Sequence, residues 1–291
     1  MLKGSLVALV TPFKEGRVDE VRLRELVNWH IQNGTSGIVP CGTTGESATL
    51  TEEEHNNVID IVVDEAKKRI PVIAGTGSNN TKEAIKFTKH AEQIGADASL
   101  LICPYYNKPT QNGLYEHFKA IANSVEIPIV LYNIESRTGV NMTPELVQKL
   151  SLIDNIQYIK EASGDLSQMS EIIKLCGDNL TLLSGDDALL LPVLAIGGAG
   201  VISVVANIAP RDVANMINYF QQGNIAQARE YHYKLFKLIK AMFIETNPIP
   251  VKKAMEIMGL CSGELRLPML EMNPANVEKL KQAMREYGIA F

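Results

Sequence analysis

The sequence has 291 residues, of which 46% are hydrophobic and 21% are charged, and its net charge at pH 7 is −5. This length suits a single large α/β barrel, and this composition is typical of a globular protein with a large core. Acidic and basic residues are interspersed, so the chain lacks the basic stripe that contacts phosphates, and we expect no nucleic-acid partner.

Eight short apolar segments recur along the chain. They are 5–12, 36–42, 71–77, 98–104, 128–133, 156–162, 180–186 and 200–207. Amphipathic segments with helical spacing lie between them, such as 19–34, 51–69 and 81–95. Most of the apolar segments do not alternate polar with apolar residues, which is typical of parallel strands covered on both faces. Eight strand–helix units close a (β/α)8 TIM barrel, so we predict this α/β fold rather than an open doubly wound sheet.

Residues that favour helix ends flank the amphipathic segments. Thr51 and Glu54 have the spacing of a capping box, and Pro144 follows Thr143 at the first position of a helix. Three glycines stand where helices are expected to end: Gly34, Gly95 and Gly223. These signals place helix boundaries between the predicted strands.

The segment 188–210 carries no charge and is long enough to be a transmembrane helix. However, Pro192 lies near its start, and Gly197, Gly198 and Gly200 interrupt its middle. We therefore predict a buried helix, a glycine turn and a buried strand. The apolar run at the N-terminus is too short for a signal peptide.

Four cysteines are scattered along the chain without a C-x-x-C pair: Cys41, Cys103, Cys176 and Cys261. This pattern indicates reduced thiols rather than a disulfide framework or a zinc site. The five histidines lack metal-ligand spacing such as HExxH, so we expect no metal and no other cofactor. We expect a soluble, cytoplasmic protein with no membrane partner.

The alternation of strands and helices stops after residue 223. Residues 224–244, 248–259 and 274–287 have helical periodicity, and the NPIP sequence at 247–250 forms a rigid joint between them. The sequence thus predicts a catalytic barrel over residues 1–223 and a C-terminal helical domain over residues 224–291.

Lys160 stands at the end of an apolar strand in the sequence NIQYIKEASG, 155–164. Lysine is rarely buried, and a lysine at a strand end usually extends to water. In a TIM barrel, however, the active site lies at the carboxyl ends of the strands, where Lys160 meets hydroxyls, glycines, two tyrosines and an arginine. Burial lowers the pKa of an amine, and a free amine forms a Schiff base with a carbonyl substrate. This placement favours a nucleophilic lysine.

Other polar residues at the same barrel mouth suit this chemistry. Tyr132, one strand away, is a candidate to shuttle the protons that imine formation requires. The GTTG turn at 42–45 offers backbone N–H groups and the hydroxyls of Thr43 and Thr44 to a substrate carboxylate. In isolation, Tyr132 would be interpreted as a core aromatic and Arg137 as a surface ion-pair residue.

The SGDD sequence at 184–187 contains an acidic pair of a kind that can bind metal. We instead expect Asp186 and Asp187 to cap the helix that follows, since aspartate is favoured at that position.

Five motifs resemble those of the dihydrodipicolinate synthase family of class I, Schiff-base aldolases, which also includes N-acetylneuraminate lyase. They are GTTGES (42–47), PYYNKPTQNGLYEHF (104–118), YNIESRTG (132–139), IKEASGD (159–165) and SGDD (184–187). The similarity runs from residue 1 to the C-terminal helices, and the motifs together are highly specific. It implies condensation of pyruvate with L-aspartate-4-semialdehyde, a step of lysine and diaminopimelate biosynthesis. It also implies a homotetramer built as a dimer of dimers.

The resemblance implies a role for each residue that matches a catalytic position. Lys160 matches the lysine that forms the Schiff base with pyruvate. Tyr132, Thr43 and Tyr106 match a proton relay, in which Tyr106 reaches in from the partner subunit.

The residues that match substrate-binding positions form a second group. Thr44 matches the residue that binds the carboxylate of pyruvate, and Arg137 matches the one that meets the carboxylate of the semialdehyde. Two further residues match positions that line the pyruvate pocket through their backbone: Gly185 and Ile202.

The resemblance also implies an allosteric lysine site at the dimer interface. Six residues match it: Ser47, Ala48, His55, Asn79, Glu83 and Tyr105. Glu52 stands where some lysine-sensitive relatives have a histidine, so we expect weak or moderate inhibition. Glu135 replaces the usual proline between Tyr132 and Arg137, and its carboxylate is in a position to compete for the Arg137 guanidinium.

Two other functions fit the same residues. One is a related pyruvate-dependent aldolase that acts on a sugar acid such as N-acetylneuraminate. Arg137 argues against it, because such lyases lack that arginine. The other is a non-catalytic small-molecule binder on the same scaffold, which would tolerate the loss of Lys160.

Overall fold

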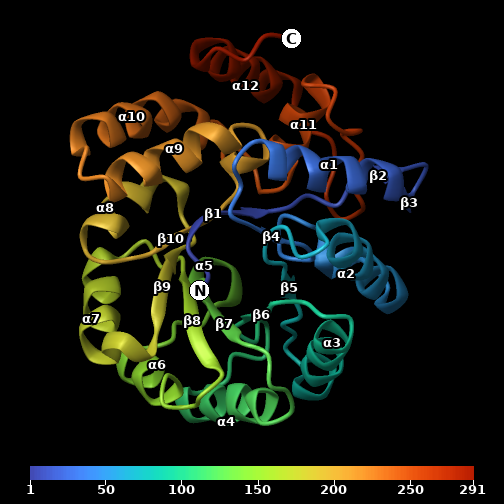
Figure 1. Cartoon of the computed structure of the whole chain (residues 1–291). Helices are drawn as coiled ribbons and strands as arrows, with labels where there is room; N and C mark the ends of the chain where they lie inside the picture. Colours follow the sequence, from blue (N-terminus) through green and yellow to red (C-terminus); the bar gives the residue numbers. More distant parts are fainter.

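The computed structural model describes all 291 residues and contains a parallel eight-stranded sheet surrounded by helices (Figure 1). All eight predicted strands are present, in somewhat shorter form. They are β1 (Gly4–Ala8), β4 (Gly37–Val39), β5 (Ile73–Gly75), β6 (Ala98–Ile102), β7 (Ile129–Asn133), β8 (Ile156–Glu161), β9 (Thr181–Ser184) and β10 (Gly200–Ser203).

The sheet closes on itself, because β4 and β5, at the two ends of the strand order, lie side by side. A parallel bridge joins Ile38 to Val72, and the Ile38 amide donates to the Pro71 carbonyl at 3.0 Å. Gly75 permits this approach, since a Cβ atom there would lie 2.3 Å from the carbonyl oxygen of Cys41. The predicted (β/α)8 barrel is confirmed.

The helices that cover the barrel are α1 (Glu20–Gln32), α2 (Glu52–Ala66), α3 (Thr81–Gln93), α4 (Gln111–Ala122), α5 (Glu135–Thr138), α6 (Pro144–Leu150), α7 (Leu166–Cys176), α8 (Leu190–Ala195) and α9 (Pro210–Gln221). The first three lie within the segments 19–34, 51–69 and 81–95 that were predicted as helical. Thr51 and Glu54 form the predicted capping box, and Pro144 is the first residue of α6. The segment 188–210 folds as α8, a glycine turn and β10, as predicted. None of the helices has the length and apolar character needed to cross a membrane.

The sequence pattern missed a short hairpin, β2 (Phe13–Lys14) and β3 (Arg17–Val18). Its turn residues, Glu15 and Gly16, both have positive φ, which is the backbone of a tight hairpin turn.

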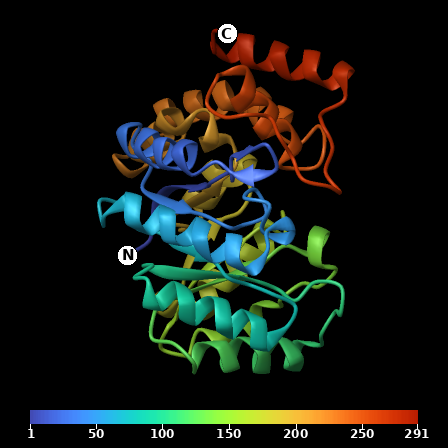
Figure 2. The same cartoon turned by 90° about the vertical axis from the view of Figure 1, so that its right-hand side faces the viewer.

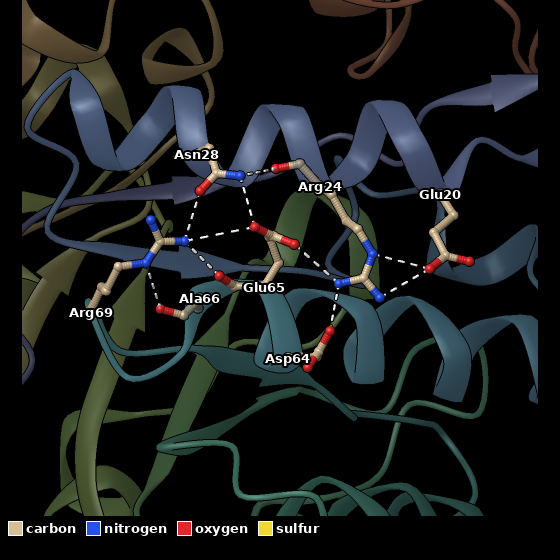
Figure 3. Close-up of polar contacts among 7 residues, drawn as sticks. All are labelled: Glu20, Arg24, Asn28, Asp64, Glu65, Ala66 and Arg69. Atoms are coloured by element: carbon tan, nitrogen blue, oxygen red, sulfur yellow. Dashed lines mark hydrogen bonds and ion pairs between the residues drawn. The ribbon is translucent and has the colours of Figure 1, made fainter.

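Polar side chains join α1 to α2 on the outside of the barrel (Figure 3). Arg24 contacts Asp64 at 2.6 Å and Glu65 at 3.1 Å across the two helices. Asn28 donates to Glu65 at 2.8 Å and accepts from Arg69 at 2.7 Å. The network is partly exposed to water.

Side chains that point into the barrel form a separate cluster of 12 buried residues. It includes Tyr132 of β7, Tyr158 of β8, Leu183 of β9 and Ile202 of β10. Because side chains two apart on a strand share a face, Lys160 points into the same interior as Tyr158.

Three helices follow the barrel, as predicted: α10 (Ile225–Ala241), α11 (Ile249–Ile257) and α12 (Pro274–Tyr287). Figures 1 and 2 show them gathered on one side of the barrel. A single hydrophobic core of 41 buried residues includes Val7 of the barrel and Leu235 and Leu280 of these helices. The C-terminal helices are therefore packed against the barrel and share its core.

Candidate active site

Lys160 lies within the barrel, and only 6% of its surface is exposed. The strand register places it between Tyr132 of β7 and Leu183 of β9. Its Nζ atom lies 4.0 Å from the centroid of the Tyr132 ring and has no ion-pair partner in the chain. Lys160 is thus a buried lysine rather than one that extends to water.

The next residue, Glu161, faces the other side of the sheet and does not neutralise Lys160. Its buried carboxylate accepts hydrogen bonds from Asn133 Nδ2 at 3.0 Å and from the Ser163 amide at 2.7 Å. Burial raises the pKa of Glu161. This carboxylate belongs to the layer between strands and helices.

Gly185, directly after β9, leaves room for the lysine side chain. A Cβ atom at this position would lie 3.1 Å from Lys160 Cε and 2.7 Å from the Cβ atom of Ala162. Ile202 of β10 is buried in the barrel interior. Both residues therefore lie in or beside the barrel interior that contains Lys160.

The loop after β4, residues 42–47 and hereafter the 42–47 loop, carries both predicted threonines. Thr44 is buried, and its Oγ1 atom accepts a hydrogen bond from Asn247 Nδ2 at 3.0 Å. The hydroxyls of Thr43 and Tyr132 make no hydrogen bond within the chain, which leaves both available to a substrate.

A cavity of about 500 Å³ opens at this end of the barrel. Thr43, Tyr132 and Arg137 line it together with Leu100 and Ile102 of β6. Lys160 is not among the lining residues, but its Nζ atom lies 4.0 Å from the centroid of the Tyr132 ring, which is. The volume falls within the range of small-molecule sites. Tyr132, the predicted proton shuttle, and Arg137 therefore face one pocket that is large enough for a substrate.

Arg137, on the short helix α5, is exposed at the mouth of this cavity. Its Nη2 atom donates to the carbonyl of Asn247 at 3.0 Å. Glu135 forms no ion pair with it, so the expected competition for the guanidinium does not occur in this structure.

Asn247 is a site residue that the sequence did not indicate. It contacts Thr44 through its side chain and Arg137 through its backbone, although it lies beyond the barrel in the sequence. The NPIP motif marked this segment only as a joint between helices.

Tyr106 is placed away from the cavity of its own chain. Its side chain is 90% exposed, and its φ of 71° is unusual for a residue other than glycine. The single chain therefore does not bring Tyr106 to Tyr132 and Thr43.

Most of the predicted allosteric residues share the cavity with the catalytic candidates. Ser47, Ala48, His55, Glu83 and Tyr105 line it, as does Glu52. His55 stacks on Phe87 with 4.2 Å between ring centroids, and burial lowers the pKa of its imidazole. Asn79 stands outside the wall and donates to the Tyr105 carbonyl at 3.1 Å.

The two aspartates of the SGDD sequence differ in role. Asp186 caps the short helix that follows, as predicted, by accepting from the Ala188 amide at 2.8 Å. Asp187 does not: its Oδ2 atom accepts from the amides of Val204 and Val205, each at 3.0 Å. The capping prediction for Asp187 was wrong because its carboxylate, at 3% exposure, turns inward to hold the chain after β10.

Comparison with known proteins adds independent evidence. A relative from Geotalea uraniireducens, named 4-hydroxy-tetrahydrodipicolinate synthase, is 58% identical over 99% of this chain and 100% of its own length. The solved dihydrodipicolinate synthase of Acinetobacter baumannii, complexed with pyruvate, is 45% identical, with a TM-score of 0.98 and full coverage of both chains. That of Cyanidioschyzon merolae, with lysine bound, is 42% identical, with a TM-score of 0.95 and 98% coverage of both. Residues 1–287 match the dihydrodipicolinate synthetase family, so the chain belongs to that family.

Proposed function

We propose that this enzyme, a 4-hydroxy-tetrahydrodipicolinate synthase, condenses pyruvate with L-aspartate-4-semialdehyde through an imine at Lys160. The observation that carries this assignment of the nucleophile is a buried lysine without an ion partner, 4.0 Å from the ring of a tyrosine that lines the pocket. The free amine of a lysine is nucleophilic toward a carbonyl carbon.

The chemistry follows from that nucleophile. Lys160 Nζ attacks the keto carbon of pyruvate, water leaves, and an imine forms. A proton then leaves the methyl carbon to give an enamine, whose carbon attacks the aldehyde of the second substrate. The amine of that substrate finally displaces Lys160, which restores the free lysine. Tyr132 and Thr43, whose hydroxyls are free, move the protons.

The carboxylates of the two substrates bind at different places. Pyruvate, covalently held within the barrel, places its carboxylate at the 42–47 loop, where Thr44 lies. The semialdehyde places its carboxylate at Arg137, at the mouth. Gly185 and Ile202 complete the pyruvate pocket, Gly185 by leaving space beside Lys160.

Tyr106 completes the proton relay from a second copy of the chain, in a homotetramer. Its near-complete exposure and its absence from its own cavity support this arrangement. In it, residues 1–223 supply the chemistry and residues 224–291 support the barrel from outside. The four buried, unpaired cysteines agree with a cytoplasmic location.

L-Lysine inhibits the enzyme weakly or moderately by binding near Ser47, His55 and Glu83. These side chains line the wall of the cavity, and Glu83 offers a carboxylate to the ammonium of the effector. Glu52 is already paired with Lys86 at 2.5 Å. Turnover should fall at millimolar lysine, and unchanged turnover would exclude this regulation.

Borohydride trapping tests the assigned nucleophile. The protein incubated with pyruvate and borohydride should gain the mass of one reduced pyruvate adduct on the peptide that contains Lys160. The variant Lys160→Met should gain none and should give no product from pyruvate and the semialdehyde. A wild-type protein without an adduct, or with turnover of N-acetylneuraminate instead, would contradict the proposal.

Mixing two inactive variants tests the role of Tyr106. In a mixed dimer of Tyr106→Phe and Lys160→Met chains, one site contains both an intact lysine and an intact tyrosine. Random exchange of subunits should restore about a quarter of wild-type activity. No recovery after subunit exchange has been verified would mean that Tyr106 does not act across subunits.

A further inference from the structure

Glu46 is a buried carboxylate within the 42–47 loop. Only 5% of its surface is exposed, and its φ of 54° lies in the left-handed region. Its amide donates to the Thr43 carbonyl at 3.1 Å, so its backbone is bonded directly to a residue of the proposed proton relay. A buried carboxylate and an unfavourable backbone conformation persist only where surrounding contacts compensate for them.

The compensating contacts come from α11 and the loop that follows it. Lys252 of α11, fully buried, places Nζ at 2.5 Å from Glu46 Oε1. The Arg266 amide, in the loop after α11, donates to Glu46 Oε2 at 3.2 Å. Both carboxylate oxygens are thus held by groups far away in the sequence.

Further contacts fix the groups that hold Glu46. Lys252 Nζ also donates to the Glu264 carbonyl at 2.7 Å and lies 4.1 Å from the centroid of the Phe13 ring. The Arg266 guanidinium lies 4.4 Å from the same centroid and donates to both oxygens of Glu54, each at 2.6 Å. Lys252 and Arg266, the two partners of Glu46, therefore have little freedom to move.

We propose that Glu46 and Lys252 are positioning residues for the reaction, because their ion pair fixes the 42–47 loop in the shape that binds the carboxylate of pyruvate. This inference rests on the proposed function of Thr44, two residues from Glu46 in the same loop. It gives α11 a place in catalysis: Asn247, just before this helix, contacts Thr44, and Lys252 within it holds Glu46.

A purely structural pair and a positioning pair differ in the properties that the protein keeps when both charges are removed. Loss of one partner leaves a buried charge uncompensated, whereas Gln at residue 46 and Met at residue 252 leave an uncharged junction of similar volume. The double variant Glu46→Gln/Lys252→Met should therefore fold but no longer hold the loop. A misplaced binding group lowers substrate affinity even when the reacting groups are intact.

Steady-state kinetics of this double variant tests the proposal. The KM for pyruvate should rise about tenfold or more, while the KM for the semialdehyde, bound at Arg137, should change less than about twofold. Borohydride trapping should reach the same adduct on Lys160 but require correspondingly more pyruvate. The matched control is Lys253→Met: Lys253 is the next residue of α11 and pairs with Glu256 away from the loop, so this variant should keep the wild-type KM.

Arg266→Gln provides a second, less disruptive variant, since the Arg266 side chain is partly exposed. It should raise the KM for pyruvate about threefold, by loosening the segment that donates to Glu46. Wild-type KM values in a folded double variant, or in Arg266→Gln if the double variant does not fold, would overturn the positioning role. Such a result with normal wild-type turnover leaves the proposed function intact, whereas a wild-type protein that forms no pyruvate adduct would overturn both.

Discussion

The barrel interior and the junction between the barrel and the C-terminal helices each bury a lysine, but in opposite surroundings. Lys160 faces an aromatic ring and apolar side chains and has no carboxylate partner. Lys252 is held by Glu46 and by the Glu264 carbonyl. Burial lowers the pKa of its ammonium, and the Glu46 carboxylate offsets part of this lowering.

The difference separates the nucleophilic role that we propose for Lys160 from the positioning role that we propose for Lys252. A buried charge is stable only when it is paired, and the barrel interior places no carboxylate beside Lys160. The junction supplies such a partner for Lys252, because Glu46 offsets part of the cost of burying its ammonium. Lysine suits both places because its neighbouring groups differ between them.

The largest effect is expected from Lys160→Met, which tests the chemical side of the comparison. Turnover should fall by at least about a thousandfold, because no other group forms the imine. The free energy of unfolding should stay the same or rise by about 1 kcal/mol, since a buried amine is replaced by an apolar chain. Coupled assays and urea unfolding measure the two quantities. A large loss of stability would mean that Lys160 is structural.

Lys252→Met should show the reverse pattern in stability. It leaves the Glu46 carboxylate buried without its partner, which should lower the free energy of unfolding by about 3 kcal/mol. Adding Glu46→Gln should recover most of this loss, and a double-mutant cycle by urea unfolding measures the coupling. Simple addition of the two single effects would show that the pair is not coupled.

Gly185→Ala changes the space around Lys160 without changing any charge. The new Cβ atom would approach Lys160 Cε and Ala162 closely, so the lysine must shift. We expect imine formation with pyruvate to slow about tenfold and stability to fall by about 1 to 3 kcal/mol. Single-turnover trapping by borohydride gives the rate. An unchanged rate would mean that the lysine adapts to the smaller space.

Acid should weaken the outer part of the junction. Arg266 donates to Glu54 and lowers the pKa of that carboxyl from its ordinary 4.5 to about 2. The pair therefore stabilises the fold fully above pH 4.5 and loses this effect as the pH falls from 4.5 toward 2. The difference in unfolding free energy between wild type and Arg266→Gln should be about 1 kcal/mol at pH 7, since the pair is partly exposed, and should shrink below pH 4.5. A difference that is constant with pH would contradict this assignment.

The smallest effect is expected in the exposed network of Figure 3, which offers a contrast with the buried junction. Arg24→Gln should lower the free energy of unfolding by about 0.5 kcal/mol, because water screens exposed ion pairs. This effect should decrease further in 0.5 M salt, where the Debye length is only about 4 Å. Thermal unfolding at two salt concentrations measures this effect. A salt-independent loss of unfolding free energy above about 2 kcal/mol would mean that this network contributes as much as a buried ion pair.

The sequence predicted the features that local patterns encode. Strands covered on both faces leave continuous apolar runs, so all eight barrel strands could be located, and Lys160 was recognised because it interrupts such a run. The hairpin at Phe13–Lys14 and Arg17–Val18 was missed because strands of two residues have no periodicity.

Contacts between distant segments could not be predicted in the same way. The bond from Asn247 to Thr44 and the pair of Glu46 with Lys252 join the C-terminal helices to the first third of the chain. No spacing or composition signal links these residues. Asp187 shows the same limit, since its backbone partners, directly after β10, compete with capping.

The closure of the barrel has a consequence for the motions of the site. Only one bridge joins β4 to β5, whereas β7 and β8 pair over five positions. The ring is therefore least resistant to opening at this seam, because local opening requires least free energy where fewest main-chain bonds must break. The 42–47 loop follows β4 at this seam. Local opening between β4 and β5 therefore displaces Thr43 and Thr44 before it displaces the strands that bear Tyr132 and Lys160.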